Sequence, residues 1–423
     1  MTAYHIDGGR RLQGEVPVSG AKNAALPVIV AAALAAEGES TIDNVPRHTD
    51  ILDLLDILEA LGVEARFTDR TTLTVSAAGL SSHVAPYPIA ARLRASTYIV
   101  GLLLARLGRA EVALPGGDAI GARPVDFHLH GFQALGADVS VARGAILAET
   151  TGLTGARFFI DRQSVGTTCN LMIAASLAEG TTVLENAARE PEVVDLAMFL
   201  TEMGAKVHGA GTGFIRIDGV PGLHGARHEI IPDRIEAGTF LLAAAATQGR
   251  VTVHSVIPEH LRVLTAKLRL AGARIRTTAD SVTLDAPRRL IHIDARTEPY
   301  PGFPTDLQPQ LVAMLSRAEG VSLVEETVFE NRFGYTNDLV RLGAQIRIVG
   351  QNTAIVTGVE RLSGAPVTAT DIRAGAALVI AALMAQGTTE VFGIQHLGRG
   401  YEHLEEKLRH LGAAIRLVED GRT

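Results

Sequence analysis

Apolar and polar positions follow one pattern that recurs along the chain. A helix-like apolar stretch ends in Leu, Met or Ala, then Gly, then Ala or Val, and a short strand-like stretch follows, as in "LEALGVEARF" and "FQALGADVSV". The glycines of this series are Gly62, Gly136, Gly204, Gly272, Gly343 and Gly412. Their spacing of about 70 residues predicts six copies of one structural unit.

A second series of glycines interleaves with the first. Here an alanine-rich helical stretch ends at a glycine and runs into a strand, as in "LAEGTTVLENA". The glycines of this series are Gly38, Gly108, Gly180, Gly249, Gly320 and Gly387. Glycine favours the residue after a helix because that position adopts a left-handed conformation. The two series together predict that each unit contains two helices and several short strands. This content is typical of an α/β fold, and six such units group as three plus three.

The helices that precede the second glycine series begin with polar residues. These are Lys22, Arg94, Ser164, Glu236, Asp306 and Arg373. A lysine in a first turn is unfavourable unless an anion lies nearby, because the start of a helix is already positive. We expect these helix starts to converge on corresponding sides of the units and to form a local positive site for phosphates or carboxylates.

Composition restricts the classes of function. The net charge of -7 across 423 residues gives no general attraction for nucleic acid or an anionic membrane. Apolar runs such as "ALPVIVAAALAA" are too short to span a bilayer, and the start of the chain lacks a signal-peptide pattern, so we expect a cytoplasmic protein. The single cysteine, Cys169, lies in an apolar helical stretch and is expected to be packed and inert. The fourteen histidines show no metal-ligand spacing, and neither a GxGxxG nor a P-loop motif is present.

Three stretches carry candidate chemistry. In "LPGGDAIGARPVDFH", Asp118 lies in a glycine-flanked loop and Arg123 stands at the start of a helix, where it could bind an oxyanion; the alternative is an exposed turn with a solvated Asp. In "PGFPTDLQPQ", Asp306 either supports a helix start by its charge or takes part in catalysis. In "HLGRGYEHLEEK", Arg399 lies between glycines and is either solvated or presented to a carboxylate or phosphate.

Together, the stretches "SGAKNAALP", "LPGGDAIGARPVDFH", "SVGTTCNLMIAASLAEGTTVLENAAREPEVVDLA", "PDRIEAGTFL", "FPTDLQPQ", "TVFENRF" and "RGYEHLEEKLRHLGA" resemble the UDP-N-acetylglucosamine enolpyruvyl transferases, collinearly over essentially the whole chain. The resemblance implies a two-domain inside-out α/β barrel of six βαβαββ-type repeats, three per domain. Domain II would comprise residues 22–231, with a mobile loop around 114–124. Domain I would combine residues 1–21 and 232–423, with the active site in the cleft between the domains.

The resemblance also implies an activity. The enzyme would transfer the enolpyruvyl group of phosphoenolpyruvate to the 3′-hydroxyl of UDP-N-acetylglucosamine by addition and elimination, releasing phosphate. This is the first committed step of peptidoglycan precursor synthesis, on which cell-wall formation, cell shape and division depend. It implies these two small-molecule substrates, no cofactor, no metal, no nucleic acid and no membrane partner, and it leaves the oligomeric state open. The alternatives are a related enzyme with another uridine nucleotide as acceptor and a catalytically silent UDP-sugar-binding protein.

Site residues follow from the same resemblance. Asp306 would be the base for the sugar hydroxyl, Asp118 the proton donor, and Lys22 and Arg399 would stabilise charge. The residues expected to bind phosphoenolpyruvate are Lys22, Asn23, Arg123 and Arg399. The residues expected to contact the UDP-sugar are Arg94, Arg123, Pro124, Val125, Asp126, Phe127, Arg162, Gln163, Ser164, Val165, Asp306 and Val328.

The sequence departs from the commonest family pattern at a few places. Asp118 stands where most members have cysteine, although some active members carry aspartate. As a proton donor it needs a pKa well above its reference value of about 3.9. Arg162 and Gln163 replace a more usual Lys-Val, an acidic residue beside Arg399 is missing, and Pro309 follows Asp306 in the same helix. These differences bear on which nucleotide is the acceptor.

Overall fold

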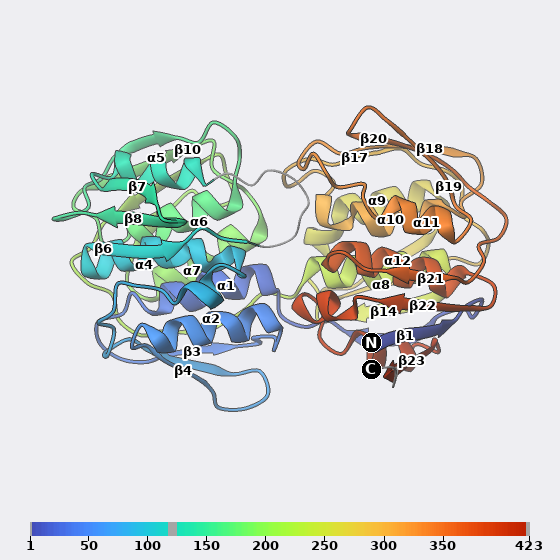
Figure 1. Cartoon of the computed structure of the whole chain (residues 1–423), viewed down its shortest axis with the longest axis horizontal. Coiled ribbons are helices and arrows are strands. Elements are labelled where there is room, and N and C mark those ends of the chain that lie inside the picture. The colour runs from blue at the N-terminus through green and yellow to red at the C-terminus, as the bar shows by residue number, and fades with distance from the viewer. Residues whose placement is uncertain (1, 117–124, 420–423) are drawn as a thin grey trace. The chain divides into compact units, whose positions relative to one another are not determined.

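The chain divides into two units (Figure 1). The computed structural model describes residues 2–116 and 125–419. Within this range, unit 1 comprises residues 2–19 and 232–419, and unit 2 comprises residues 20–116 and 125–231. The chain leaves unit 1 after Ser19 and returns to it at Pro232. At the crossing, the Asp233 N–H donates to the Ser19 carbonyl at 2.9 Å, so the outgoing and returning segments lie side by side.

Unit 2 contains the elements from α1 to β13. Its strands are β3 (Ser40–Asp43), β4 (Glu64–Phe67), β5 (Leu73–Ser76), β6 (Arg109–Ala113), β7 (Asp138–Ala142), β8 (Ala145–Glu149), β9 (Arg157–Phe159), β10 (Thr181–Glu185), β11 (Lys206–His208), β12 (Phe214–Asp218) and β13 (Arg227–Glu229). Its helices are α1 (Lys22–Ala32), α2 (Thr49–Ala60), α3 (Tyr87–Ala90), the 3-10 helix η1 (Arg94–Thr97), α4 (Tyr98–Leu107), α5 (Asp126–Ala134), α6 (Val165–Ala175) and α7 (Pro191–Glu202).

Unit 1 combines two N-terminal strands with everything after the crossing. Its strands are β1 (Thr2–Asp7), β2 (Gln13–Pro17), β14 (Arg250–His254), β15 (Arg274–Thr277), β16 (Ser281–Asp285), β17 (Ala295–Arg296), β18 (Val321–Glu325), β19 (Gln345–Val349), β20 (Thr353–Thr357), β21 (Pro366–Thr368), β22 (Thr388–Phe392) and β23 (Ala414–Glu419). Its helices are α8 (Arg234–Ala246), η2 (Pro258–Leu261), α9 (Arg262–Leu270), η3 (Thr305–Leu307), α10 (Gln308–Leu315), α11 (Thr336–Arg341), α12 (Ile372–Met384), η4 (Ile394–Arg399) and α13 (Leu404–His410).

The described residues form six small sheets with one shared topology. In β17-β18-β20-β19, for example, the first pair is parallel and the other two pairs are antiparallel. The sheet β6-β8-β7 has three strands, and a single parallel bridge from Val84 to Glu111 stands where the other sheets have their parallel edge strand. Three sheets lie in each unit, which confirms the predicted α/β fold of six repeats grouped as three plus three.

The inner helices of each unit are almost completely buried. Every residue of α1 except Asn23 is buried, and every residue of α12 is buried. Small residues permit this packing: a Cβ on Gly101 of α4 would lie 2.4 Å from Oδ1 of Asn170 on α6. Strands lie around the helices in both units, so the predicted inside-out arrangement is confirmed (Figure 1).

Two further expectations concern single features of the chain. Cys169 is fully buried in α6, and burial raises the pKa of its thiol, which keeps the thiol protonated and inert as predicted. Within residues 2–116 and 125–419, no helix has both the length and the apolar character needed to cross a membrane.

A buried histidine ties the last strand of unit 2 to α7. His228 on β13 places Nε2 3.0 Å from Oδ1 of Asp195 and Nδ1 2.9 Å from Oε2 of Glu202. Both carboxylates lie on α7, and the Phe199 ring lies 5.4 Å from the imidazole. Burial disfavours the charged ring, but hydrogen bonds and charge from the two carboxylates outweigh burial and raise the pKa of His228. A doubly protonated ring can donate to both carboxylates at once.

We expect His228→Gln to destabilise the chain in a pH-dependent way. Because the pKa of His228 is higher in the folded chain than in the unfolded chain, its stabilising contribution is fully present below about pH 6.5 and is lost as the pH rises through the folded-state pKa. Denaturant titrations of wild type and variant should differ by about 2 kcal/mol below about pH 6 and by less at alkaline pH. His254→Gln, which removes an exposed partner of Glu15, is the control and should change little. A difference that stays constant with pH would contradict the assignment.

Candidate functional site

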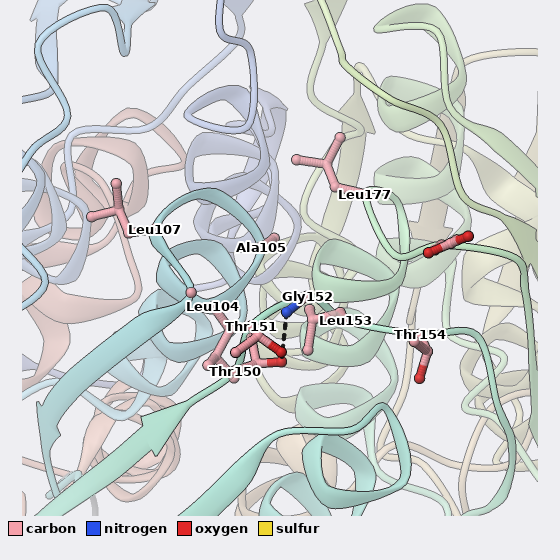
Figure 2. A pocket seen from close by; sticks show the side chains of 11 residues that line it. Leu104, Ala105, Leu107, Thr150, Thr151, Gly152, Leu153, Thr154 and Leu177 are labelled. Carbon is pink, nitrogen blue, oxygen red and sulfur yellow. Dashed lines mark hydrogen bonds between the residues drawn. The ribbon is translucent and has the colours of Figure 1, made fainter.

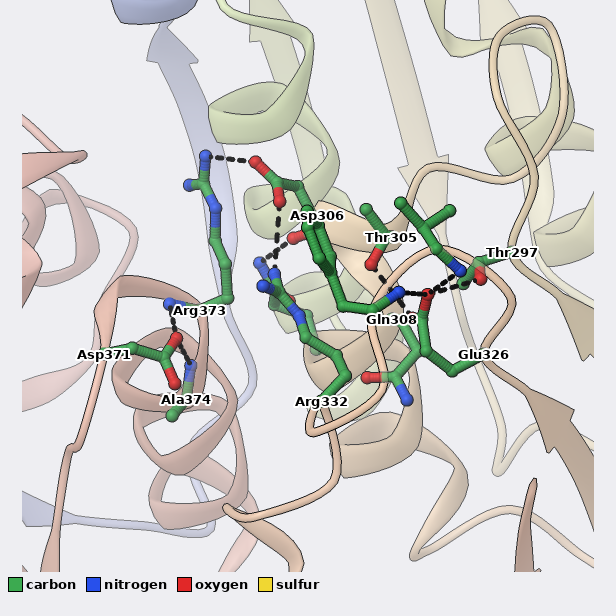
Figure 3. Close-up of polar contacts among 12 residues, drawn as sticks. Thr297, Thr305, Asp306, Gln308, Glu326, Arg332, Asp371, Arg373 and Ala374 are labelled. Carbon is green, nitrogen blue, oxygen red and sulfur yellow. Dashed lines mark hydrogen bonds and ion pairs between the residues drawn. The ribbon is translucent and has the colours of Figure 1, made fainter. Parts of the chain in front are cut away.

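In unit 1, a carboxylate lies between two buried arginines (Figure 3). Asp306 is in η3, directly before α10, and its Oδ1 accepts from Nη2 of Arg332 at 3.1 Å. Its Oδ2 accepts from Nη2 of Arg373, in the first turn of α12, at 2.8 Å. The Asp306 side chain is 26% exposed, whereas the Arg332 and Arg373 side chains are 2% and 6% exposed. The carboxylate is therefore accessible while its cationic partners are fixed in the core.

A buried network of hydroxyl groups binds the Arg373 guanidinium at Nη1, while Nη2 binds Asp306. Its Nη1 donates to the Tyr401 hydroxyl at 3.3 Å, which lies 2.9 Å from Oγ1 of Thr239 on α8. Gln310 on α10 donates from Nε2 to the Tyr401 hydroxyl at 3.2 Å and to the Asp306 carbonyl at 3.0 Å. Burial alone would lower the pKa of Arg373, but the Asp306 carboxylate outweighs it and raises this pKa. The network joins the middle of α8 to the starts of α10 and α12 around one charged pair.

The loop that carries Arg332 is fixed by a buried glutamate. Oε1 of Glu326 accepts from the Val328 N–H at 2.8 Å and from Oγ1 of Thr297 at 2.8 Å. Its Oε2 accepts from Oγ1 of Thr305, the residue before Asp306, at 2.9 Å. Glu326 therefore positions Val328 and Asp306 relative to each other, a role that the sequence analysis missed.

Arg399 ends η4 close to the start of α12. It is partly buried, and Gly400 after it packs so closely that an added Cβ would lie 2.6 Å from Ile372 and 3.6 Å from Nη1 of Arg373. Glycine at this position lets the chain pass against α12. The structure thus places Arg399 within the same part of unit 1 as Asp306, Arg332 and Arg373.

A second ionic network anchors the crossing segment in unit 1. Oε1 of Glu236, in the first turn of α8, accepts from Nζ of Lys407 at 2.5 Å, and its Oε2 accepts from the Ser19 N–H at 2.7 Å. Lys407 also donates to Oγ of Ser19 at 2.8 Å. Burial raises the pKa of Glu236, although Lys407 opposes this. The role of Glu236 is therefore to fix Ser19 in unit 1. The pattern of polar residues at helix starts did not distinguish this structural role from substrate binding.

In unit 2, Lys22 forms an ion pair with a carboxylate of the same chain. Its Nζ lies 2.9 Å from Oδ2 of Asp50, in the first turn of α2, and both side chains are 8% exposed. The sequence predicted an anion beside this lysine but did not identify Asp50. Asn23, the next residue, is exposed at the start of α1.

The starts of α4, α5 and α6 are linked through a buried histidine. Nδ1 of His128 lies 3.0 Å from Nδ2 of Asn170, which also donates to the Thr97 carbonyl of η1 at 2.8 Å. Burial, and to a smaller extent the charge of Arg94, lower the pKa of His128 to about 3, so the ring is neutral. Arg94, the partly buried first residue of η1, therefore lies near the start of α5.

The remaining predicted residues of unit 2 line these helix starts. Ser164 is the N-cap of α6, and its Oγ accepts from the Thr167 N–H at 3.2 Å. Arg162 is exposed, Gln163 donates to the Ala187 carbonyl at 3.4 Å, and Val165 begins α6. Val125 is buried at the N-cap of α5, Asp126 is exposed and Phe127 is partly buried. Asp118, Arg123 and Pro124 lie outside the described residues.

Among the residues that the structure describes, no group of three or more His, Cys, Asp or Glu side chains is arranged to hold a metal ion. The charged groups brought together are a carboxylate with several arginines in unit 1 and a buried lysine–aspartate pair in unit 2. The set in unit 1 is cationic, because two arginines share one carboxylate. Cationic sets bind phosphates and carboxylates and can stabilise charge as it shifts during a reaction.

Comparisons of sequence place the chain among curated relatives. It is 58% identical over 422 residues to the UDP-N-acetylglucosamine 1-carboxyvinyltransferase 2 of Symbiobacterium thermophilum, covering 100% of this chain and 99% of the relative. It is 52% identical over 422 residues to the UDP-N-acetylglucosamine 1-carboxyvinyltransferase 2 of Carboxydothermus hydrogenoformans, covering 99% of this chain and 100% of the relative.

Comparisons of structure agree with these results. The enolpyruvyl transferase NikO from Streptomyces tendae matches with a TM-score of 0.89 and 27% identity, covering 98% of each chain. EPSP synthase from Acinetobacter baumannii matches with a TM-score of 0.77 and 18% identity, covering 99% of this chain and 100% of that one, and shows the shared fold. A family model described as EPSP synthase (3-phosphoshikimate 1-carboxyvinyltransferase) matches residues 6–408. The chain therefore belongs to the family of enolpyruvyl transferases that this model describes.

Proposed function

We propose that this chain transfers the enolpyruvyl group of phosphoenolpyruvate to the 3′-hydroxyl of UDP-N-acetylglucosamine and releases phosphate. The observation that carries the proposal is the accessible Asp306 carboxylate between the buried guanidinium groups of Arg332 and Arg373. The names of the curated relatives, at 50% identity and above over the whole chain, support the choice of substrates. The enzyme would then act in the cytoplasm in peptidoglycan precursor synthesis.

Asp306 has the properties of a group that accepts a hydroxyl proton. Two adjacent guanidinium charges favour its ionised form, and ion pairs on both oxygens fix its direction. A hydroxyl that donates to this carboxylate becomes more nucleophilic as its proton shifts toward the oxygen. The buried arginines keep the carboxylate in place, and its side chain stays 26% exposed.

The reaction needs two balanced steps. In the first, the sugar oxygen bonds to C2 of phosphoenolpyruvate, Asp306 takes the hydroxyl proton, and an acid protonates C3. In the second, C3 loses a proton and the C2–O bond to phosphate breaks, which gives the enolpyruvyl ether and inorganic phosphate. We propose Asp118 as the acid and Lys22, Asn23, Arg123 and Arg399 as the groups that bind phosphoenolpyruvate. The proposal requires the residues of both units to act on one pair of substrates, as the family resemblance implies.

The helix starts of unit 2 are proposed to bind the nucleotide. Ser164 and Val165 begin α6, Val125 and Asp126 begin α5, and a helix start favours a diphosphate. Arg94, Pro124, Phe127, Arg162 and Gln163 complete this set, and Val328 in unit 1 is expected to contact the sugar.

The deciding experiment measures phosphate release from phosphoenolpyruvate with and without UDP-N-acetylglucosamine, with the nucleotide product identified by mass. Release that depends on this nucleotide and yields its enolpyruvyl ether supports the proposal. Release with another uridine nucleotide alone indicates the related enzyme with a different acceptor. Nucleotide binding without any release indicates a silent binding protein.

We expect Asp306→Asn to lower kcat by about 10²- to 10⁴-fold because the amide cannot take the hydroxyl proton. The amide has nearly the shape of the carboxylate, so the KM values should change much less than kcat. Phosphate-release kinetics measure both parameters. Asp285→Asn, on a strand and paired with Arg274, is the matched control and should retain wild-type kcat. An Asp306→Asn variant with wild-type turnover would exclude Asp306 as the base.

We expect fosfomycin, which alkylates the loop cysteine of relatives, to leave this enzyme covalently unmodified because Asp118 stands at that position. The intact mass after incubation with fosfomycin and UDP-N-acetylglucosamine should equal that of the untreated chain. Asp118→Cys is the positive control and should gain one adduct. An adduct on the wild-type chain would refute this expectation.

A further inference from the structure

The two units share a loop that can be aligned by its hydrogen bonds. In unit 2, the Glu179 N–H donates to the Leu153 carbonyl at 2.8 Å. In unit 1, the Glu319 N–H donates to the Leu290 carbonyl at the same distance of 2.8 Å. Both glutamates directly precede a glycine of the second repeat series. Leu153 and Leu290 are therefore equivalent positions, and each loop ends at the C-terminal end of the inner helices.

The residue before this leucine is Arg289 in unit 1 and Gly152 in unit 2. The Arg289 guanidinium joins the turn that follows α10 to the segment that follows β20: its Nη2 donates to the Ala318 carbonyl at 3.1 Å and to the Val359 carbonyl at 2.9 Å, and its Nε donates to the Arg317 carbonyl. A guanidinium is favoured at this position because three backbone carbonyls accept its N–H groups, and hydrogen bonds from a charged donor are stronger than those from a neutral one. With Arg289 in place, the cavity here measures only about 10 Å³.

Unit 2 has a large cavity at the equivalent position (Figure 2). Its volume is about 450 Å³, and it lies between the C-terminal ends of α4 and α6. Leu104, Leu107 and Leu177 give it apolar walls, and Glu179 contributes a carboxylate at its rim. Leu177 occupies the position equivalent to Arg317, and Gly152 the position equivalent to Arg289. The cavity in unit 2 therefore lacks both of these arginines.

The carbonyls that Arg289 caps also have equivalents in unit 2. Val359 corresponds to Val220, because their N–H groups donate to Ser316 and Ser176 at 2.8 and 3.0 Å. The equivalent acceptors are therefore the carbonyls of Leu177, Ala178 and Val220. Within the described residues, no arginine side chain is hydrogen-bonded to these three carbonyls, whereas the helix end of α1 receives Nη1 of Arg106 at the carbonyls of Ala33 and Ala35.

We propose that the cavity at the ends of α4 and α6 binds a small organic cation of the alkylguanidinium class, with its planar head in the place that Arg289 occupies in unit 1. Of the three equivalent residues, Leu177 lines the cavity. The head would donate to the Leu177 carbonyl and face Glu179, and the alkyl stem would lie against the side chains of Leu104, Leu107 and Leu177. The site is at the helix ends opposite to the starts that carry Lys22 and Ser164. It does not depend on the proposed function.

The test uses n-butylguanidinium and its neutral isostere n-butylurea, titrated into the full-length chain by isothermal calorimetry. We expect a saturable site for n-butylguanidinium with a dissociation constant in the millimolar range, and binding of n-butylurea about tenfold weaker or absent. Equal binding of the two probes, or no saturable binding of n-butylguanidinium, would overturn the proposal.

Two variants of Gly152 locate the site. A Cβ at Gly152 would meet no atom within 4 Å, so both substitutions fit the backbone. Gly152→Arg supplies the guanidinium from the chain itself; it should abolish n-butylguanidinium binding and raise the unfolding midpoint by about 2 °C. Gly152→Ala is the matched control and should bind like wild type. Unchanged binding by Gly152→Arg, or a lowered midpoint, would contradict the assignment.

The converse substitution tests the equivalence of the two places. Arg289→Ala should open the cavity in unit 1 and lower the unfolding midpoint, and n-butylguanidinium should restore more of this loss than n-butylurea does. If both probes raise the unfolding midpoint of Arg289→Ala to the same extent, the stabilisation comes from filling the cavity with apolar groups and not from a guanidinium that donates to the carbonyls. This result would overturn the proposal.

Discussion

Each unit is built around inner helices so completely buried that a polar group on their sides needs a buried partner, as Asn170 and Thr239 have. The sides of α1 and α12 meet other apolar surfaces along their whole length. The first N–H groups and last carbonyls of such helices still need partners, because a buried unpaired backbone group costs free energy. Polar chemistry therefore collects at two places in each unit, the helix starts and the helix ends.

The two sets of ends are used differently. At the starts, the chain places charged side chains in partly accessible positions, such as Asp306 beside Arg373, or buries them in pairs, such as Lys22 with Asp50. At the C-terminal ends, arginines close the helices by donating to backbone carbonyls, as Arg289 and Arg106 do. The same repeat thus supplies reactive groups at one end and structural caps at the other, which separates function from stability within a single architecture.

The sequence was sufficient to predict the periodic features of the fold, but it was insufficient to predict the hydrogen-bond and ion-pair partners of the site residues. The two glycine series predicted six repeats because left-handed residues after helices leave a local signal. The prediction of a left-handed glycine was wrong at Gly249, where the preceding Gln248 has the positive φ instead. The apolar neighbours of Cys169 likewise predicted its burial. The partners of Asp306 could not be predicted in this way, because Arg373 lies 67 positions away and meets it only through the packing of α10 against α12. Asp50 beside Lys22 and Glu326 behind Val328 were missed for the same reason, since such pairings depend on tertiary contacts and carry no local pattern.

The pairing of β1 has a consequence for how the chain is made. This first strand lies between β22 and β23, the last two strands of the described chain, and β2 pairs with β14 after the crossing. During synthesis β1 must therefore wait until β22 and β23 have left the ribosome, whereas β2 can pair as soon as β14 has emerged. Unit 2, whose described strands pair only with one another, can complete its sheets long before then. The ribosome thus imposes an order of assembly in which β1, made before the other described strands, is among the last of them to be incorporated.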